Sequence, residues 1–348
     1  MIESRKSDHV KICLDEDVEV EKNYWNDIKF YHQAAPEIDF EDISLGVDFL
    51  GKRLSAPIII AGMTGGYEGA EVLNRRLAET AEEMRVGLGV GSQRAALEDK
   101  DLRKSYELIS DHSIPLLFGN IGAPQLISQD EEQPFGISKG KEALEMIDGD
   151  YLAVHFNYLQ EAVQPEGDMK SKGVTKALKD LSKEVPIIAK ETGAGISPGT
   201  AMSFRDAGVE AIDVGGMGGT SFSGVEHYRI DDENKKMKDI AKDLWDWGIP
   251  TPVSVVECRG RVSLPIIATG GIRSGIQIAK ALALGADAVG IAGGLLPAIE
   301  KSKKTAIDYL KRLKRELKIT MFLLGCEDLD DLMSVNRVIT GELKDWIE

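Results

Sequence analysis

The stretch Pro265–Gly275, PIIATGGIRSG, decides the fold. A run of apolar, mostly β-branched residues ends abruptly in glycines, and Ile276, Ala279 and Ala283 then recur at helical spacing. Short continuous apolar runs are typical of parallel strands that are buried on both faces. The stretch therefore predicts a strand, a glycine-rich turn and a helix, in that order.

The same pattern recurs along the chain. The other apolar runs are PIIIAGMTGG from Pro57, VGLGVGSQR from Val86, PLLFGNIGAPQ from Pro115, YLAVHFN from Tyr151, PIIAKETGAGIS from Pro186, AIDVGGMGGTS from Ala211 and AVGIAGG from Ala288. Eight strand-then-helix units are what a (β/α)8 TIM barrel, an α/β fold, requires. A doubly wound open sheet is the alternative fold, but eight units fit closure of the sheet better.

The rest of the chain is expected to surround this barrel. We expect residues 1–56 to form an N-terminal extension, residues 57–300 the barrel, and residues 301–348 C-terminal helices. Residues 222–264 contain two helix-like pieces and are interpreted as an insertion that passes over the barrel mouth. No low-complexity or Pro/Ser-rich linker divides the chain, which predicts one domain overall.

Composition narrows the classes of function. The formal net charge is −16, and proteins that bind nucleic acid usually carry a basic patch, so no nucleic-acid partner is expected. No apolar run approaches the roughly 20 residues of a membrane span, and MIESRKSDHV lacks a signal-peptide core. The cysteines Cys13, Cys258 and Cys326 lie far apart, which is typical of a reduced cytoplasmic protein without a membrane partner.

The last two predicted strands indicate a phosphate site. Small residues in Thr269–Gly275 precede a helix that opens near Ser274, and Ala292–Gly294 closes the eighth strand. Glycines let backbone N–H groups approach an anion, and a helix N-terminus favours negative charge. The loops after strands seven and eight are the usual phosphate site of such barrels. Turn glycines without a ligand are the alternative.

Polar residues end several other strands. Thr64, Ser92, Asn120 and Thr220 follow strands one, two, three and six. Each alone would be an ordinary loop residue. Together they form a ring of donors and acceptors around the mouth, which suits a flat heteroaromatic ligand anchored by its phosphate.

Lys190 ends the fifth apolar run. A lysine there is costly if it is buried and unpaired. It could form a Schiff base, contact an anion or stabilise negative charge on a cofactor ring. A structural ion pair with Glu191 or Asp213 is the alternative.

The loop after strand four concentrates polar groups: His155, Asn157, Gln160 and Glu161. One carboxylate together with substrate phosphates and waters is a common way to hold Mg²⁺, and no His/Cys cluster indicates zinc. Near the N-terminus, Arg5, Lys6 and His9 could be a frayed basic end or could help an acidic protein to bind an anion.

Several of these stretches together resemble one family, the type 2 isopentenyl-diphosphate isomerases, which depend on FMN. The stretches are RKSDHV, GMTGG, GVGSQR, HFNYLQEAVQPEG, IIAKETG, GGMGGTS and TGGIRSG, and they occur in the family's order from about residue 5 to residue 297. Any one glycine motif is shared by many barrels. The H-x-N-x-x-Q-E loop combined with the N-terminal R-K and with G-S-Q-R is much more specific.

The resemblance implies an activity and its cofactors. It implies a TIM barrel that interconverts isopentenyl and dimethylallyl diphosphate by a 1,3-proton shift, a step of isoprenoid biosynthesis without net redox change. It also implies FMN as cofactor, Mg²⁺, and NADPH or NADH to reduce the flavin, which acts in the proton transfer. A homotetramer or homo-octamer is implied as well.

The resemblance also assigns roles to residues by position. FMN contacts would be Met63, Thr64, Gly65, Ser92, Asn120, Lys190, Thr220, Gly271, Ile272, Arg273, Ala292 and Gly293. Substrate contacts would be Arg5, Lys6, Ser92, Gln93, Arg94, His155, Asn157 and Gln160, and Glu161 would hold Mg²⁺. Among the catalytic residues, Gln160 and His155 would orient the substrate, because an amide is a poor acid or base, and Lys190 would stabilise the anionic reduced ring.

Three other functions fit parts of the pattern. An FMN-dependent 2-hydroxy-acid oxidase needs a base and an arginine pair for a carboxylate substrate. A flavin-free phosphosugar enzyme needs only the phosphate site. A non-catalytic sensor of phosphate or flavin would not depend on Gln160 and Glu161.

Overall fold

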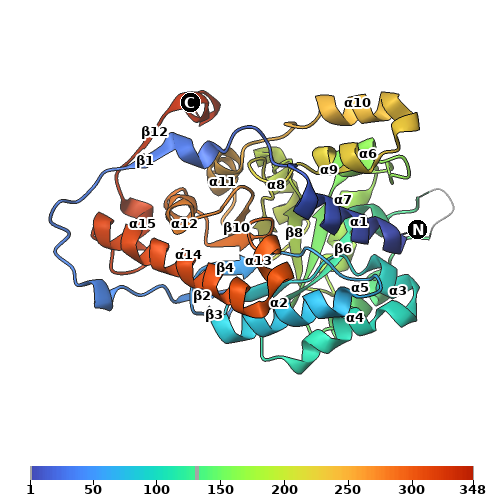
Figure 1. Cartoon of the computed structure of the whole chain (residues 1–348), viewed down its shortest axis with the longest axis horizontal. Coiled ribbons are helices and arrows are strands. Elements are labelled where there is room, and N and C mark those ends of the chain that lie inside the picture. The colour runs from blue at the N-terminus through green and yellow to red at the C-terminus, as the bar shows by residue number, and fades with distance from the viewer. Residues whose placement is uncertain (1, 130–132, 348) are drawn as a thin grey trace.

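The computed structural model describes residues 2–129 and 133–347, with only the backbone of residues 2–5. Its centre is a closed barrel of eight parallel strands (Figure 1). They are β4 (Ile58–Ile60), β5 (Gly87–Gly89), β6 (Leu117–Gly122), β7 (Tyr151–Phe156), β8 (Ile187–Glu191), β9 (Ala211–Asp213), β10 (Ile266–Thr269) and β11 (Ala288–Ile291). The eight apolar runs of the sequence supply these strands, so the predicted barrel is confirmed and the open sheet is wrong.

The barrel closes between its last and first strands. Val289 of β11 pairs with Ile58 of β4, and Ile291 pairs with Ile60. Ile58, Ile60, Val289 and Ile291 have no exposed surface. Burial on both faces explains why these strands are continuous apolar runs.

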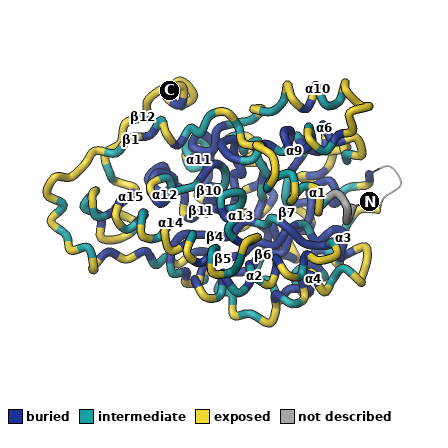
Figure 2. Tube along the Cα trace, in the orientation of Figure 1, coloured by how far each residue is buried: buried dark blue, intermediate teal, exposed yellow. Residues whose placement is uncertain are grey.

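Helices surround the barrel. The outer layer contains α2 (Ala70–Met84), α3 (Arg94–Glu98), α4 (Lys104–Glu107), α5 (Ile137–Glu145), α7 (Val174–Ser182), α8 (Pro198–Asp206), α11 (Thr251–Arg259), α12 (Gly275–Ala283), α13 (Leu296–Lys301) and α14 (Lys303–Leu324). Short 3-10 helices lie at Tyr24–Asp27, Phe40–Asp42, Lys100–Leu102, Leu108–Asp111, Ala123–Leu126 and Asp232–Asn234. Figure 2 shows buried strands at the centre and exposed residues on the outer helices.

One helix differs in detail from its predicted face. The predicted start of α12 near Ser274 is confirmed, because the Ser274 hydroxyl accepts a hydrogen bond from Gln277 N at 3.4 Å. Ile276, however, is 48% exposed, whereas Ile278 and Leu282 are buried. α14 packs on α12, so the buried face of α12 is wider than the sequence predicted, and Ile276 lies outside that face.

Three elements lie over the carboxyl ends of the barrel strands. They are α1 (Ile2–Asp15), α6 (Tyr158–Val163) and α9 (Phe222–Arg229); α10 (Lys235–Asp243) packs on α9. Both α1 and α6 contact α9 (Figure 1). The N-terminus of the chain therefore lies at the mouth of its own barrel.

The two ends of the chain meet outside the barrel. β1 (Ile28–Phe30) pairs antiparallel with β12 (Arg337–Ile339), between α15 (Asp331–Ser334) and α16 (Gly341–Ile347). The sequence predicted only helices after residue 301, and β12 corrects that expectation. The strand was missed because its partner lies some 300 residues away in the sequence. The division of the chain at residues 56 and 300 stays a prediction. No helix in the described part of the chain is both long and apolar enough to span a membrane.

A hairpin closes the other end of the barrel. β2 (Val47–Phe49) pairs antiparallel with β3 (Lys52–Leu54). Phe49 and Leu54 are buried in one cluster with Ile59, Phe118 and Ile188 from the barrel strands. This plug fills the amino-terminal end of the barrel with side chains.

We predict that Leu54→Ala lowers the free energy of unfolding by about 2–5 kcal/mol, because it leaves a cavity in this plug. Urea unfolding followed by circular dichroism measures the loss. The neighbouring Arg53→Ala removes only an exposed ion pair with Asp48 and should cost at most about 1 kcal/mol. Equal losses in the two variants would contradict the role of the plug.

Candidate active site

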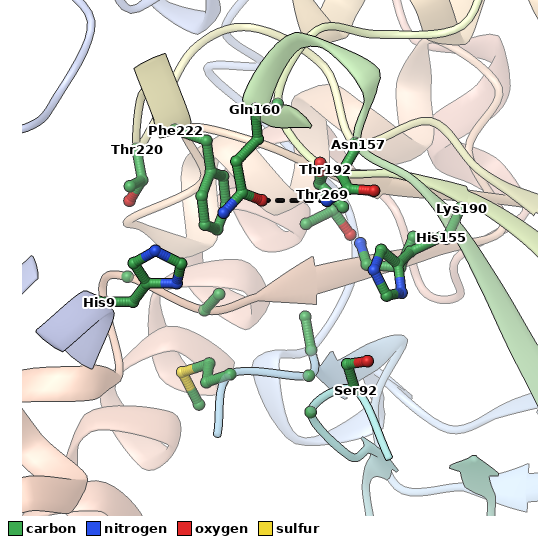
Figure 3. A pocket seen from close by; sticks show the side chains of 18 of the residues that line it. His9, Ser92, His155, Asn157, Gln160, Lys190, Thr192, Thr220, Phe222 and Thr269 are labelled. Atoms are coloured by element: carbon green, nitrogen blue, oxygen red, sulfur yellow. Dashed lines mark hydrogen bonds between the residues drawn. The ribbon is translucent and has the colours of Figure 1, made fainter. Parts of the chain in front are cut away.

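The carboxyl ends of the barrel strands open into a pocket with an empty volume of about 1650 Å³, counted to its open mouth. Most of the predicted site residues meet there. They are Lys6, Met63, Thr64, Gly65, Ser92, Arg94, Asn120, His155, Asn157, Gln160, Glu161, Lys190, Thr220, Gly271, Arg273, Ala292 and Gly293. Figure 3 shows His155 and Lys190 on one side of the pocket, with Gln160 and Thr220 across from them.

Two predicted residues are placed differently, and the side chain of a third is not described. Gln93 is fully buried in the barrel wall, where its Oε1 accepts from Asn120 N and its Nε2 donates to the Ala143 carbonyl, both at 2.8 Å. This corrects the expectation that the Gln93 side chain contacts substrate. The side chain of Ile272 is 1% exposed and belongs to the core, so only its backbone could reach a ligand. The side chain of Arg5 lies outside the described residues.

Glycines shape the end of the pocket near β10 and β11. A Cβ on Gly293 would lie 3.0 Å from Thr220 Oγ1 and 3.2 Å from an Arg273 guanidinium nitrogen. Gly271 has a φ of 72°, and a Cβ there would lie 2.1 Å from the Gly218 carbonyl oxygen. Side chains at these glycines would clash with their protein neighbours, so glycine lets the loops after β9, β10 and β11 pack closely around the Arg273 guanidinium, which also forms an ion pair with Glu19.

The N-terminal segment crosses this glycine-lined end. Val20 N donates to the Gly219 carbonyl at 2.9 Å, Asn23 Nδ2 to the Gly271 carbonyl at 2.7 Å, and Trp25 Nε1 to the Gly270 carbonyl at 2.9 Å. These bonds hold the loops after β9 and β10 in place. The sequence offered no signal for them, because they join segments about 200 residues or more apart.

Lys190 forms an ion pair, as one of its predicted alternatives required. Its Nζ lies 2.7 Å from Asp213 Oδ2, while the lysine still lines the pocket. The other possible partner, Glu191, instead accepts hydrogen bonds from Gly193 N at 2.6 Å and Ala194 N at 2.5 Å. Burial raises the pKa of Glu191 to about 7, although these N–H bonds oppose the shift.

His155 is held in one tautomer. Its Nδ1 lies 2.7 Å from Asn120 Oδ1, and Asn120 Nδ2 already donates to the Val90 carbonyl at 2.8 Å. Asn120 Oδ1 is therefore the acceptor and His155 Nδ1 the donor. In the neutral ring Nε2 is then a hydrogen-bond acceptor.

Gln160 is oriented by two neighbours. Its Oε1 accepts from Asn157 Nδ2 at 3.2 Å, and its Nε2 donates to Glu226 Oε1 at 3.0 Å. Glu226 has no exposed surface and also contacts His9 Nε2 at 2.9 Å and Arg229 Nε at 2.6 Å. Burial raises the pKa of Glu226, but the bonds from His9 and Gln160 and the charge of Arg229 outweigh it and hold this pKa below its ordinary value.

Sequence reasoning missed Glu226. The signal that could have found it is its position on the helix that follows the glycine-rich end of strand six, FSGVEHYR. Nothing in the sequence shows that this helix turns its carboxylate toward Gln160, because the contact depends on how α9 packs on α6.

Glu161 lies beside unpaired oxygen atoms. Its carboxylate accepts from Asn157 Nδ2 at 2.8 Å, Gln164 Nε2 at 2.6 Å and Asp168 N at 2.8 Å. The amide oxygens Asn157 Oδ1 and Gln164 Oε1 are buried without a hydrogen-bond partner. Within the described residues, no three His, Cys, Asp or Glu side chains gather as a metal site. One carboxylate with nearby amide oxygens fits Mg²⁺ that keeps waters and binds phosphate.

The cations at the mouth are engaged by protein acceptors. Lys6 Nζ donates to the carbonyls of Gly65 at 2.9 Å and Ser92 at 2.5 Å. Arg94 contacts Asp168 at 2.8 Å and Glu98 at 3.1 Å. Both side chains nevertheless line the pocket, so an anion could share them.

Comparison with known proteins identifies the family. The family model of the FMN-dependent dehydrogenases matches residues 153–338. An isopentenyl-diphosphate delta-isomerase of Picrophilus torridus is 45% identical over 100% of this chain and 99% of its own. Another, of Archaeoglobus fulgidus, is 46% identical over 99% of this chain and 98% of its own. The chain belongs to the FMN-dependent, type 2 isopentenyl-diphosphate delta-isomerases.

Solved structures of differently named proteins share the fold of this isomerase. A flavocytochrome b2 with sulfite bound has a TM-score of 0.67 and 18% identity, covering 95% of this chain and 83% of its own. A soluble mutant of (S)-mandelate dehydrogenase from Pseudomonas putida has a TM-score of 0.64 and 17% identity, covering 96% of this chain and 91% of its own. At such identities the likeness shows the barrel fold alone.

The pocket of this isomerase fits FMN on two observations. Thr220, Arg273 and the N-terminus of α12 converge beside Gly293 in the wall of the pocket, an arrangement that suits an anion. The Thr269 hydroxyl, at the end of β10, is buried without a hydrogen-bond partner and lines the same pocket. A phosphate at the first position and polar ring atoms near the second would meet groups that are ready to bind them.

We predict that Gly293→Ala weakens FMN binding at least about 10-fold, equivalent to about 1.4 kcal/mol, because the new methyl group would lie 3.0 Å from Thr220 Oγ1 and 3.2 Å from an Arg273 nitrogen and would displace these pocket-lining side chains. Quenching of flavin fluorescence in a titration of apoprotein measures the dissociation constant. Gly199→Ala is the matched control, since a Cβ there meets no atom within 4 Å. An unchanged FMN affinity in Gly293→Ala would place the phosphate elsewhere.

Proposed function

We propose that this isomerase interconverts isopentenyl and dimethylallyl diphosphate by a 1,3-proton shift, as a cytoplasmic enzyme of isoprenoid biosynthesis. A proton is added at one end of the three-carbon allylic unit and removed from the other, so electrons and atoms balance. We further propose Mg²⁺ as a requirement, NADPH or NADH as the reductant of FMN, and a homotetramer or homo-octamer as the assembly.

One observation carries the proposal. The pocket joins a glycine-lined end at β10 and β11 to a second group of polar lining residues that includes Lys6, Arg94, Gln160 and Glu161. Two anion sites in one cavity suit a phosphorylated cofactor beside a diphosphate substrate. A carboxylate substrate, as in a 2-hydroxy-acid oxidase, would not call for a metal-binding carboxylate at the same mouth.

The diphosphate would be held by charge. Arg94 presents a planar guanidinium that can bind phosphate oxygens in pairs, and Lys6 adds a point charge. Glu161 would hold Mg²⁺ against the same oxygens, with the amide oxygens of Asn157 and Gln164 nearby. These groups make a local cationic site on an acidic protein.

The hydrocarbon end of the substrate would be oriented by neutral groups. Gln160 has its amide fixed between Asn157 and Glu226, and the His155 ring is held by the hydrogen bond between its Nδ1 and Asn120 Oδ1. Neither residue needs to change protonation to hold the substrate. When bound, reduced FMN would supply the acid/base group for the proton shift, and Lys190 would stabilise negative charge on its ring.

We predict that the purified protein forms dimethylallyl diphosphate from isopentenyl diphosphate under anaerobic conditions with FMN, Mg²⁺ and NADPH. The product is followed by chromatography. It should disappear when either FMN or the reductant is left out, and a 5-deaza analogue of FMN should bind without supporting turnover.

Three other results would contradict parts of this proposal. If the protein binds flavin but forms no product, the proposed substrate is wrong. Turnover without flavin, or full turnover with the 5-deaza analogue, would remove the flavin from the proton transfer. Oxygen consumption with 2-hydroxy acids would favour the oxidase.

We predict that Glu161→Gln raises the Mg²⁺ concentration needed for half-maximal activity at least about 10-fold, because a neutral amide binds the cation less well. FMN affinity should not change, since Glu161 lies in the other half of the pocket. Glu145→Gln, on the exposed side of α5, is the matched control. An unchanged Mg²⁺ requirement would assign the metal to other residues.

A further inference from the structure

A row of alternating charges lies behind Gln160. Glu226 Oε1 accepts a hydrogen bond from Gln160 Nε2 at 3.0 Å and lies 2.9 Å from His9 Nε2. Glu226 Oε2 accepts a hydrogen bond from Arg229 Nε at 2.6 Å. The guanidinium of Arg229 also lies 2.8 Å from Glu166 Oε1, in the loop after α6. Arg229 thus joins the buried carboxylate to a partner near the surface, because the side chain of Glu166 is 47% exposed.

A carboxylate with no exposed surface needs compensation for its charge. The charged or titratable groups that face Glu226 are His9 from α1 and Arg229 from its own helix, α9. From α6 comes the neutral Gln160, and α10 packs on α9 through contacts such as Ser223 Oγ with the Ala241 carbonyl. Of the two groups, only Arg229 keeps its charge at every working pH.

The charge of Glu226 decides how the Gln160 amide points. The two ends of an amide are nearly equal in size but opposite in hydrogen bonding. An ionised carboxylate can only accept, so it selects the nitrogen of Gln160 and leaves the oxygen toward Asn157. A protonated carboxyl group could donate to the oxygen instead, and the amide could then turn over.

We propose that Arg229 is a positioning residue, which fixes the orientation of the Gln160 amide by keeping Glu226 ionised. Arg229 itself does not line the pocket. The inference rests on the proposed function only for the statement that Gln160 orients the isomerase substrate. The link from Arg229 through Glu226 to Gln160 stands on the contacts alone.

The first test compares Arg229→Gln and Arg229→Lys with the wild-type holoenzyme, with kcat and KM measured from about pH 5 to pH 9. Without the guanidinium the pKa of Glu226 rises, so the decline of kcat on the acid side should move up by about one pH unit. At neutral pH Glu226 stays ionised, so kcat should change less than about 3-fold, whereas near pH 5 kcat should fall about 3-fold to 10-fold while KM changes less. Arg229→Lys, which keeps the charge, should restore the acid side.

Arg205→Gln is the matched control, because Arg205 is an exposed arginine on α8 that pairs with Asp206. It should leave kcat and its pH dependence unchanged. A lower kcat in Arg229→Gln with the wild-type acid side would overturn the proposal and reduce Arg229 to a packing role. So would a failure of Arg229→Lys to restore the acid side.

A second measurement does not depend on activity. The chain has five histidines, so 13C-histidine labelling can resolve the ring of His9, which touches the Glu226 carboxylate. As the pH changes, the chemical shift of the His9 ring should show a step where Glu226 titrates. This step should occur at higher pH in Arg229→Gln than in wild type. If Arg229→Gln does not fold, the step in Arg229→Lys should stay at the wild-type pH. An equal midpoint in wild type and Arg229→Gln, or a raised midpoint in Arg229→Lys, overturns the link. A wild-type enzyme without isomerase activity would refute the proposed function but not this titration.

Discussion

The hydrogen bonds that close β11 onto β4 are the constraint on which the rest of the structure depends. A closed sheet of parallel strands brings all eight carboxyl ends to one rim. His155 and Lys190, which pair in register on neighbouring strands, therefore face the same cavity. An open sheet would spread the same strand ends along an edge, and the polar ring read from the sequence would not enclose a ligand.

Closure of the barrel gathers several cationic side chains in one pocket, and each of them contacts an acceptor in the protein. In a chain of net charge −16, every described cation that lines the pocket already contacts an acceptor. Arg94 contacts Asp168, Lys190 contacts Asp213, Arg273 contacts Glu19, and Lys6 contacts backbone carbonyls. These contacts hold long side chains in place, so an arriving phosphate meets groups whose conformational entropy is already reduced. The acceptors also mean that a phosphate must compete for each cation, which favours ligands of high charge density over monoanions.

Hydrophobic periodicity and turn residues were enough to predict the barrel from the sequence. The eight strands and the residues at their ends follow from local sequence, because each apolar run ends where its strand ends. The role that the family resemblance gave to the Gln93 side chain was wrong, because this side chain is fully buried in the barrel wall between the pocket residues Ser92 and Arg94. Periodicity failed for Ile276, which lies outside the face of α12 that α14 and the barrel bury. The hairpin plug, the pairing of β1 with β12 and the contact of His9 with Glu226 join distant segments, and no local pattern encodes them.

The contacts among the elements over the barrel mouth could not be predicted from the sequence. Flavocytochrome b2 and mandelate dehydrogenase share the barrel at 17–18% identity. A glycine-lined end near β10 and β11 is what such barrels can share for a phosphorylated cofactor. The groups around Gln160 instead come from α1, α6 and α9, which lie over the mouth and pack on one another. Their geometry depends on the buried Glu226, which binds α1 through His9 and α6 through Gln160. One carboxylate thereby couples the docking of the N-terminal helix to the orientation of Gln160, so a change in how α1 packs would reach the pocket without altering the barrel.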